Sequence, residues 1–306
     1  MAMLIRSMLY VPANSWRMIN NCLNEGADAV ILDLEDGCPM GEKETARVFA
    51  RDAMPIIREQ GLHVFVRVNS LDTRMTAQDL TYVVTQGLEG IVLPKTETAE
   101  EIRTLDAMLA KREEAKGLEK GQTAIMALIE TPLGVLNVRE IIGASPRVIG
   151  VAFGAGDYSR EMGAGMGVTR IPPEEYFTMT LAARSALAMA ARASGIHAID
   201  TPFFGLVIDM DGLVRESGKV KLLGFSGKQL THPRHVAPVN QVFSPAAEEV
   251  ELARQVVAAY AEAQAKGLGA TSVGGRMIDY GSFKRAQALL GLDEAIRARE
   301  SRGGAG

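Results

Sequence analysis

Short apolar runs recur along the chain, and each of them ends in polar residues. The runs are rich in Val, Ile and Leu and are continuous rather than alternating, which is typical of strands buried on both faces of a parallel sheet. Eight runs are found, at residues 7–14, 29–36, 63–70, 90–97, 124–131, 148–157, 197–203 and 224–233. The pattern therefore predicts eight strands.

Segments with helical periodicity separate these runs. Residues 43–61 place small and apolar side chains on one face, and residues 172–195 begin with prolines and acids and end at a glycine. The polar strand ends recur every ~30–40 residues, about one βα unit each, and eight such units make a (β/α)8 barrel. A doubly wound open sheet is the competing α/β fold. We favour the barrel because the count is eight and because no G-x-G-x-x-G motif follows the first strand.

The barrel domain is predicted to cover residues 1–240. An amphipathic helix follows at 243–267, with acids near its start and a lysine and a glycine at its end. A glycine-rich loop and the stretch RMIDYGSFKRAQALL come after it. We therefore expect residues 241–306 to form a C-terminal helical extension, or lid, appended to the barrel.

Composition limits the classes of partner. The 306 residues are 47% hydrophobic and 23% charged, so the chain can bury a substantial core. A net charge of −4 gives no general attraction to nucleic acid or to anionic membranes, and no run approaches the roughly 18 apolar residues of a membrane span. Cys22 and Cys38 are too few for a disulfide framework, and no signal peptide is visible. We expect a cytoplasmic protein that binds neither nucleic acid nor membranes.

The polar groups at the predicted strand ends are mostly acidic. In a (β/α)8 barrel the active site gathers at the C-terminal ends of the strands. So much carboxylate needs a compensating cation, and a hard divalent ion with oxygen ligands fits best, namely Mg²⁺ with Mn²⁺ as the alternative. A zinc site is not expected, because the four histidines are scattered. The acids concerned are Asp33, Glu35, Asp36, Glu130, Asp157 and Asp200.

Glu130 and Asp157 are the candidate metal ligands among these acids. Each ends an apolar run, and the glycines at 154 and 156 let the backbone approach a ligand closely. From the pattern alone, a cap on the next helix or an ion pair with a lysine explains either carboxylate equally well.

Two cations lie among the predicted strands. Arg67 lies inside a buried run and needs a carboxylate partner, which either the protein or a substrate can supply. Lys95 follows another run. Nothing near it indicates the lowered pKa of a Schiff-base lysine, so a structural or steering role is favoured.

The series of motifs resembles a known family. The chain resembles the citrate lyase β-subunit-like enzymes of the HpcH/HpaI aldolase family, which also holds malyl-CoA and citramalyl-CoA lyases. The resemblance is carried by YVPAN, ILDLEDG, FVRVNSLDT, IVLPK, ALIETPLGV, AFGAGDYSREMG, GKQLTHPRHVAPVNQVFSP and GGRMIDYGSFKRAQ. It implies a Mg²⁺-dependent (β/α)8 lyase that acts on coenzyme A thioesters as a homotrimer or homohexamer.

The resemblance also implies roles for individual residues. Glu130 and Asp157 match the two metal-binding carboxylates, and Arg67 matches the arginine that holds the substrate's terminal carboxylate. Asp279 matches an aspartate that the C-terminal segment places in a neighbouring subunit's active site, where it would be the acid–base group.

The acids of the LDLED motif surround the metal in this family. Glu35 and Asp36 would bind the water ligands of the ion. Asp33 points to the other face of the strand from Leu34 and is expected to be structural.

Coenzyme A needs basic contacts for its phosphates. Lys43 and Arg47, one helical turn apart, are candidates together with Arg17, although a solvated helix face explains Lys43 and Arg47 equally well. The first loop departs from the family, because relatives often have glycine where Ala13 stands and Trp16 is unusual.

The implied reaction splits a 3-hydroxyacyl-CoA of the malyl-, citramalyl- or citryl-CoA type into an acyl-CoA such as acetyl-CoA and a 2-keto acid. Two alternatives stay open. The same site could act as an acyl-CoA thioesterase or in a malate synthase-like reaction, or the chain could be the β-subunit of a citrate lyase complex. The sequence does not select the acyl group.

Overall fold

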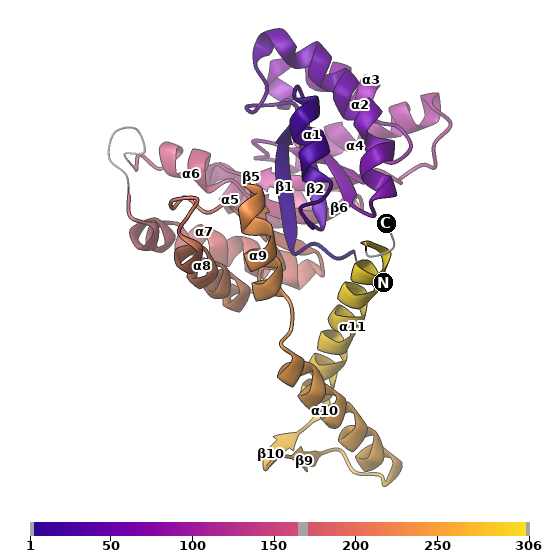
Figure 1. Ribbon diagram of the computed structural model, residues 1–306, viewed down its shortest axis with the longest axis vertical. Coiled ribbons are helices and arrows are strands. Elements are labelled where there is room, and N and C mark those ends of the chain that lie inside the picture. Colours follow the sequence, from indigo (N-terminus) through magenta and orange to yellow (C-terminus); the bar gives the residue numbers. More distant parts are fainter. Residues whose placement is uncertain (1–2, 165–170, 304–306) are drawn as a thin grey trace. The chain divides into compact units, whose positions relative to one another are not determined.

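The computed structural model describes residues 3–164 and 171–303. Eight parallel strands form a closed barrel in the order β1 to β8, and β1 also pairs with β8 (Figure 1). The predicted strands and the (β/α)8 fold are therefore confirmed. The strands are β1 (Ser7–Pro12), β2 (Ala29–Asp33), β3 (His63–Arg67), β4 (Gly90–Leu93), β5 (Ala124–Ile129), β6 (Val148–Phe153), β7 (His197–Asp200) and β8 (Gly227–Leu230).

The continuous apolar runs follow from burial on both faces of the barrel wall. Every residue of β2 is buried. Val30 and Leu32 belong to the apolar cluster that the strands share with the helices. Because side chains alternate along a strand, Ile31 and Asp33 face the barrel interior. Asp33 is the last residue of β2, and at this depth the interior opens into a cavity.

Helices surround the strands, and the predicted helices at residues 43–61 and 172–195 are confirmed as α2 and α7. The helices of this part are α1 (Trp16–Cys22), α2 (Lys43–Glu59), α3 (Thr76–Val83), α4 (Ala99–Ala115), α5 (Pro132–Gly143), α6 (Ala155–Glu161), α7 (Pro173–Ser194), α8 (Met210–Leu223) and α9 (Val236–Phe243). Single 3-10 turns occupy Met40–Glu42, Leu71–Thr73 and Pro233–His235.

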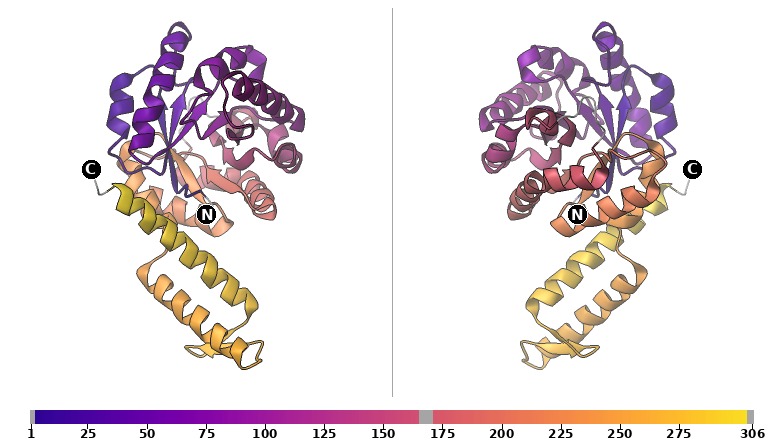
Figure 2. Two further views of the ribbon diagram at one scale, coloured as in Figure 1. Left: turned by 90° about the vertical axis from the view of Figure 1, so that its right-hand side faces the viewer. Right: turned by 90° about the vertical axis from the view of Figure 1, so that its left-hand side faces the viewer.

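The chain divides into two compact units, one of Ile5–Phe243 and one of Ser244 onward together with the first few residues. The second unit consists of α10 (Ala247–Ala265), β9 (Thr271–Val273), β10 (Arg276–Ile278) and α11 (Tyr280–Gly303). Figure 2 shows α10 and α11 alongside each other, with the β9–β10 hairpin at one end. A small apolar core holds this unit together, formed by Ala253, Val256, Tyr260, Ile278 and Ala286.

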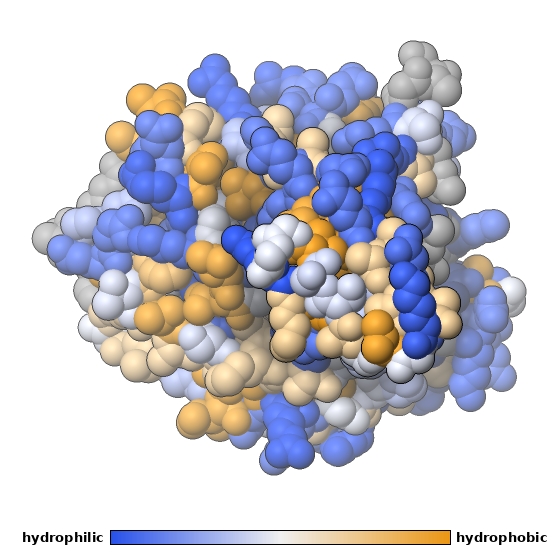
Figure 3. Space-filling view, turned by 90° about the horizontal axis from the view of Figure 1, so that it is seen from below, coloured by the Kyte–Doolittle hydropathy of each residue, from blue (hydrophilic) through white to orange (hydrophobic). Residues whose placement is uncertain are grey.

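Among the described residues, no helix is long and apolar enough to cross a membrane. Figure 3 shows hydrophobic residues in small patches among hydrophilic ones on the face that it views. Scattered apolar exposure of this kind is ordinary on globular proteins and does not by itself indicate a binding surface.

Candidate active site

A cavity of about 460 Å³ opens where the strands of the barrel end. Residues at the ends of most of the strands, or in the loops that follow them, contribute to its walls, as expected for the active-site end of such a barrel. Apolar and polar neutral side chains form much of the lining. The charged residues that line it are Asp33, Asp36, Arg67, Glu130 and Asp157.

Asp33 organises the acidic loop after β2. Its carboxylate accepts hydrogen bonds from the backbone N–H groups of Glu35 and Gly37, both at 2.9 Å. A Cβ atom at position 37 would collide with the same carboxylate, which explains the glycine that follows the acids. Asp33 also pairs with Arg67 through Nε at 2.7 Å and Nη2 at 2.6 Å. These bonds agree with the structural role expected for Asp33.

Arg67 therefore has protein carboxylates as partners. Besides the two bonds to Asp33, its Nη1 lies 3.0 Å from Oε2 of Glu35. Its guanidinium also lies over the ring of Tyr10, 4.8 Å from the centroid. Arg67 still lines the cavity, so a fixed, partly neutralised cation faces the space that a ligand would occupy.

Glu130 follows β5 and is 3% exposed. Oε1 accepts the backbone N–H of Lys95 at 2.8 Å. The cap of α5 is supplied by Thr131, whose hydroxyl accepts the N–H of Gly134, so Glu130 does not cap the next helix. Burial, together with the negative charges of Glu35 and Asp157, raises the pKa of Glu130 to about 8, against the opposing effect of the Lys95 N–H.

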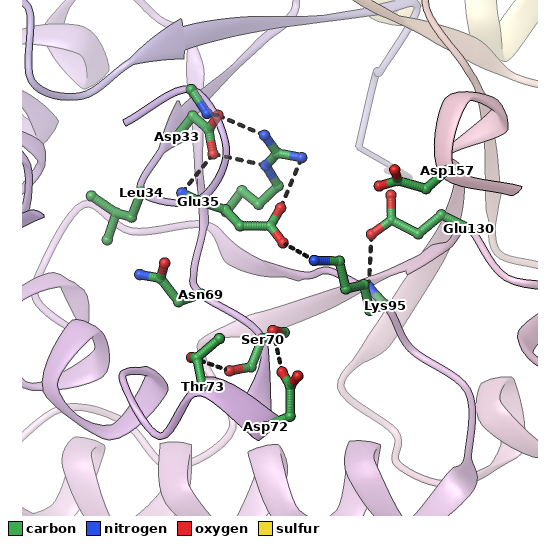
Figure 4. A network of polar contacts seen from close by, with 12 residues as sticks. Asp33, Leu34, Glu35, Asn69, Ser70, Asp72, Thr73, Lys95, Glu130 and Asp157 are labelled. Atoms are coloured by element: carbon green, nitrogen blue, oxygen red, sulfur yellow. Dashed lines mark hydrogen bonds and ion pairs between the residues drawn. The ribbon is translucent and has the colours of Figure 1, made fainter. Parts of the chain in front are cut away.

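Asp157 lies in the first turn of α6 and lines the same cavity. Figure 4 shows its carboxylate beside that of Glu130. It pairs with the largely exposed Arg160 at 2.7 Å, and such a contact within a surface helix turn holds a side chain weakly. A Cβ at Gly154 would collide with Glu130. This glycine therefore makes room for a carboxylate of the site rather than for a ligand directly.

Glu35 and Asp36 differ in their surroundings. Glu35 is buried, and its pKa is raised chiefly by burial although Arg67 lies beside it. Asp36 is exposed and lines the cavity. Asp36 therefore lies in the wall of the cavity, whereas Glu35 does not line it and pairs with Arg67 and Lys95.

The donor set fits Mg²⁺ as an occupant. Three or more His, Cys, Asp or Glu side chains arranged to hold a metal are not found in residues 3–164 and 171–303. Mg²⁺ usually keeps several of its waters and is held by only one or two protein carboxylates. Glu130 and Asp157 supply that number. Four carboxylates and one arginine are the charged side chains that line this cavity among the described residues, so its lining carries excess negative charge.

The three residues predicted to contact coenzyme A differ in their exposure to solvent. Arg17 is exposed on α1, as a phosphate contact requires. Lys43 and Arg47 are buried, so neither lies on a solvated helix face. Nζ of Lys43 donates to the carbonyl oxygens of Leu34 and Glu35, and Nε of Arg47 donates to a fully buried Asp79 at 2.6 Å. Their bonds argue against a role for Lys43 and Arg47 in phosphate binding.

Two further predicted acids, Asp200 and Asp279, have hydrogen-bond partners of their own. Asp200 was expected at the rim, but it is fully buried and bonds to Arg184 at 2.8 Å and to Lys228 at 2.6 Å. Its placement at the rim was wrong, because its side chain points into the barrel wall. Asp279 belongs to the C-terminal unit, where its exposed carboxylate accepts the N–H of Ser282 at the start of α11. That bond holds the pKa of Asp279 below its usual range.

Sequence reasoning missed the neutral polar residues of the cavity. The hydroxyl of Tyr10 donates to Gln229 at 2.8 Å, and Nε2 of Gln229 donates to the carbonyl oxygens of Phe153 and Asp200. The ring of Tyr10 lies under Arg67, and Gln229 links its hydroxyl to the ends of β6 and β7. The place of Tyr10 in the YVPAN motif was the available signal, but neither residue carries a charge that would single it out.

Comparison with known proteins places this site in a family. A family model described as HpcH/HpaI aldolase/citrate lyase matches residues 6–233, which include all the charged residues of the cavity. The chain belongs to this family. The family expected from the motifs and the class of enzyme, a carbon–carbon lyase, are confirmed.

Relatives match almost the whole chain. Citrate lyase subunit beta of Leuconostoc mesenteroides subsp. cremoris is 38% identical, over 97% of this chain and 96% of its own length. The L-malyl-CoA/beta-methylmalyl-CoA lyase of Cereibacter sphaeroides is 32% identical, over 96% of both chains. Among solved structures, CitE from Mycobacterium tuberculosis in complex with magnesium, acetoacetate and coenzyme A is 26% identical, with a TM-score of 0.74 over 99% of this chain and 100% of that one.

Proposed function

We propose that this chain is a Mg²⁺-dependent lyase that cleaves a 3-hydroxyacyl-CoA of the malyl-, citramalyl- or citryl-CoA type. The products are an acyl-CoA such as acetyl-CoA and a 2-keto acid. Support comes from a family that contains both citrate lyase subunits and malyl-CoA lyases, and from a structural relative with magnesium and coenzyme A bound. Two buried, free cysteines, Cys22 and Cys38, are in keeping with a cytoplasmic location.

The observation that carries the proposal is the pair of carboxylates beside an arginine in one cavity. Glu130 and Asp157 hold the metal ion, and Glu35 and Asp36 accept hydrogen bonds from its waters. When bound, Mg²⁺ supplies Lewis-acid polarisation of the oxygen that changes between hydroxyl and carbonyl. The excess negative charge of the cavity prepares it for a divalent cation.

Arg67 binds the carboxylate of the keto acid. A guanidinium has five N–H donors. The ion pairs with Asp33 and Glu35 fix the plane of the guanidinium and use three of these donors, and Arg67 lines the cavity, so the remaining donors are available to a ligand there. A charge-assisted bond from these donors orients the substrate, so that its hydroxyl or keto oxygen lies next to the two metal-binding carboxylates.

Asp279 carries out the proton transfer at the α-carbon of the thioester. Its carboxylate is ionised near neutral pH and can accept a proton, although its lowered pKa makes it a weaker base than a free aspartate. It acts in the site of a neighbouring subunit of a homotrimer or homohexamer. This part of the proposal depends on the resemblance to the family and on the exposure of Asp279 in the C-terminal unit.

A second candidate function is favoured by one observation. Several relatives at 37–38% identity are citrate lyase β subunits, whereas the malyl-CoA lyases share 31–32%. In that case the chain acts on a thioester only within a larger complex. The two functions use the same cavity and differ in whether the purified chain turns over free coenzyme A esters.

The deciding experiment supplies purified protein with Mg²⁺ and with malyl-, citramalyl- or citryl-CoA in turn, and identifies the products by mass spectrometry. A Glu130→Gln variant and a chelator-treated sample run alongside. We expect a keto acid and a shorter acyl-CoA from one ester, and neither product in the two controls.

Other outcomes would change the assignment. Free coenzyme A with an intact acyl chain would make the protein a thioesterase. No turnover of any ester would exclude the stand-alone lyase and favour the complex subunit. Turnover that survives chelation would contradict the role given to the metal.

A further inference from the structure

The chain turns sharply after β4, and neighbouring elements fix this turn. Thr96 is fully buried. Its hydroxyl donates to the carbonyl of Leu93 at 2.8 Å, and its N–H donates to the carbonyl of Leu128 in β5 at 3.2 Å. The turn is thus tied to the neighbouring strand. The residue before Thr96 is Lys95, which consequently lies beside the end of β5, where Glu130 follows.

Lys95 has a backbone conformation that residues other than glycine rarely adopt. Its φ of +51° lies in the left-handed region, where a Cβ atom is crowded by the following carbonyl. In this conformation its N–H points at Glu130 and donates to Oε1 at 2.8 Å. A glycine would adopt the same backbone without steric cost. Non-glycine residues held in this way cluster at functional sites, so the lysine side chain needs a reason beyond the turn.

The side chain of Lys95 provides a second contact with the site. Nζ lies 3.3 Å from Oε1 of Glu35, while Oε2 of the same carboxylate lies 3.0 Å from Nη1 of Arg67. Figure 4 shows Lys95 between Glu130 and Glu35. Glu35 is therefore shared between two cations. The side chain of Glu35 is 7% exposed, whereas that of Lys95 is 41% exposed.

We infer that Lys95 is a positioning residue for this site. Its N–H orients Glu130, and its ammonium holds one oxygen of Glu35 and so prevents that carboxylate from pairing fully with Arg67. The donors of Arg67 that face the cavity then stay available for the substrate carboxylate. This inference rests on the proposed function, because it concerns the same metal and keto-acid site.

The arrangement predicts effects of opposite sign on the two ligands. Without the ammonium, Glu35 turns both oxygens to Arg67, and the cavity also loses one positive charge. Both changes weaken the binding of an anionic keto acid. The same loss of positive charge removes a repulsion on a divalent cation, so Mg²⁺ binds at least as tightly as before. A variant that only destabilises the fold would lower the affinity for both ligands.

The test uses the full-length protein and isothermal titration calorimetry. Mg²⁺ is titrated first, and glyoxylate, pyruvate and oxaloacetate are titrated into the Mg²⁺-saturated protein. Lys95→Met and Lys95→Gly both lose the ammonium and keep the N–H, but only the glycine is free of the left-handed strain. Lys95→Arg restores a cation. Lys111→Met, at an exposed lysine of α4 in the same βα unit, is the matched control.

In both Lys95→Met and Lys95→Gly, we expect about fivefold lower affinity for the keto acid that the wild type binds. This is the upper range for the loss of a partly exposed ion pair. Mg²⁺ affinity should not fall in either variant. Lys95→Arg should recover most of the keto-acid affinity, and Lys111→Met should match the wild type. The glycine variant should melt no lower than the methionine variant.

Two results would overturn the role of Lys95 while leaving the proposed function intact. One is wild-type affinity for both ligands in Lys95→Met. The other is a loss of affinity for both Mg²⁺ and the keto acid in Lys95→Met, together with a lower melting temperature. That result would mean that Lys95 only stabilises the fold. If the wild type binds neither Mg²⁺ nor a keto acid, the proposed function fails, and the inference fails with it.

Discussion

Two clusters of charged side chains in the barrel differ in their balance of charge. The rim cluster consists of four residues that line the cavity, Asp33, Arg67, Glu130 and Asp157, and of Glu35 and Lys95, which contact them. The closed cluster lies between β7, β8, α7 and α8 and consists of Arg184, Asp200, Glu216 and Lys228. The closed cluster has two cations for two carboxylates and is almost free of solvent. The rim cluster has four carboxylates for two cations, apart from the largely exposed Arg160 that pairs with Asp157.

The difference shows in the pKa values of one acid from each cluster. Burial favours the neutral form of both Asp200 and Glu130. The pKa of Asp200 is nevertheless lowered, because Arg184 and Lys228 bond to it directly. That of Glu130 is raised to about 8, chiefly by burial, to which the negative charges of Glu35 and Asp157 add. A balanced buried cluster holds the fold together, whereas one with excess carboxylate is prepared for a cation from outside.

The largest effect on the free energy of unfolding is expected from a substitution that disrupts the closed cluster. Asp200→Asn removes the charge that Arg184 and Lys228 share and leaves both cations buried with one remaining carboxylate. Breaking a buried ion pair from one side costs about 3–5 kcal/mol, so the free energy of unfolding should fall by that amount in urea titrations. Asp211→Asn, at an exposed position of α8, should change it by less than about 0.5 kcal/mol. A loss below about 1 kcal/mol at Asp200 would mean that the cluster is not structural.

A smaller effect tests a second buried ion pair, between Arg147 and Glu113, in which Arg147 also pairs with the partly exposed Asp106. Arg147 bonds to Glu113 at 2.7 Å, and the N–H groups of Gly121 and Thr123 donate to the same carboxylate. Although burial opposes ionisation, these bonds lower the pKa of Glu113 to about 2. The carboxylate therefore stabilises the fold fully above its unfolded pKa of ~4.3, and this contribution disappears as the pH falls toward 2.

Glu113→Gln provides the measurement for this second ion pair. The free energy of unfolding should be about 2 kcal/mol lower in the variant near pH 6, the order expected from the pKa shift. The gap should narrow steadily when urea midpoints are measured down to pH 3. A gap that is independent of pH would show that the stabilisation comes from packing rather than from the ionised carboxylate.

The smallest effect concerns the rim cluster and has the opposite sign to that at Asp200. In the presence of chelator, Glu130→Gln removes a carboxyl group that burial and like charges oppose, while its amide oxygen can still accept the N–H of Lys95. We expect the free energy of unfolding to rise by about 1 kcal/mol. Added Mg²⁺ should stabilise the wild type and not the variant. Destabilisation of the metal-free variant would mean that the rim cluster, too, is satisfied without an ion.

The fold could be predicted from the sequence more fully than the site. Continuous apolar runs identified most of the strands, because burial on both faces leaves little room for polar residues, although β8 contains the buried Lys228 and Gln229. The β9–β10 hairpin was missed, because strands of three residues beside Gly274 and Gly275 are too short to show a pattern. Glu130 directly follows β5, and Asp157 follows β6 and the glycines at 154 and 156. Both could therefore be placed at the cavity.

The remaining site residues depend on partners far away in the sequence. Arg47 is neutralised by Asp79 in α3, and Asp200 by Arg184 in α7, so neither is free for the role that its position suggested. Lys95 reaches the site by a backbone conformation that no residue pattern encodes. Such contacts become visible only when the barrel brings separate βα units together.

Closure of the barrel through β1 and β8 has a consequence for synthesis in the cell. Ser7 pairs with Lys228, so the apolar first strand waits for about 220 residues to emerge before its second neighbour exists. At roughly 5–20 residues per second, a ribosome needs about 10–45 s for that length. During this interval β1 offers an unpaired edge to other nascent chains. Slow translation between β1 and β8 should therefore increase aggregation of the newly made protein, although the finished barrel has no open edge.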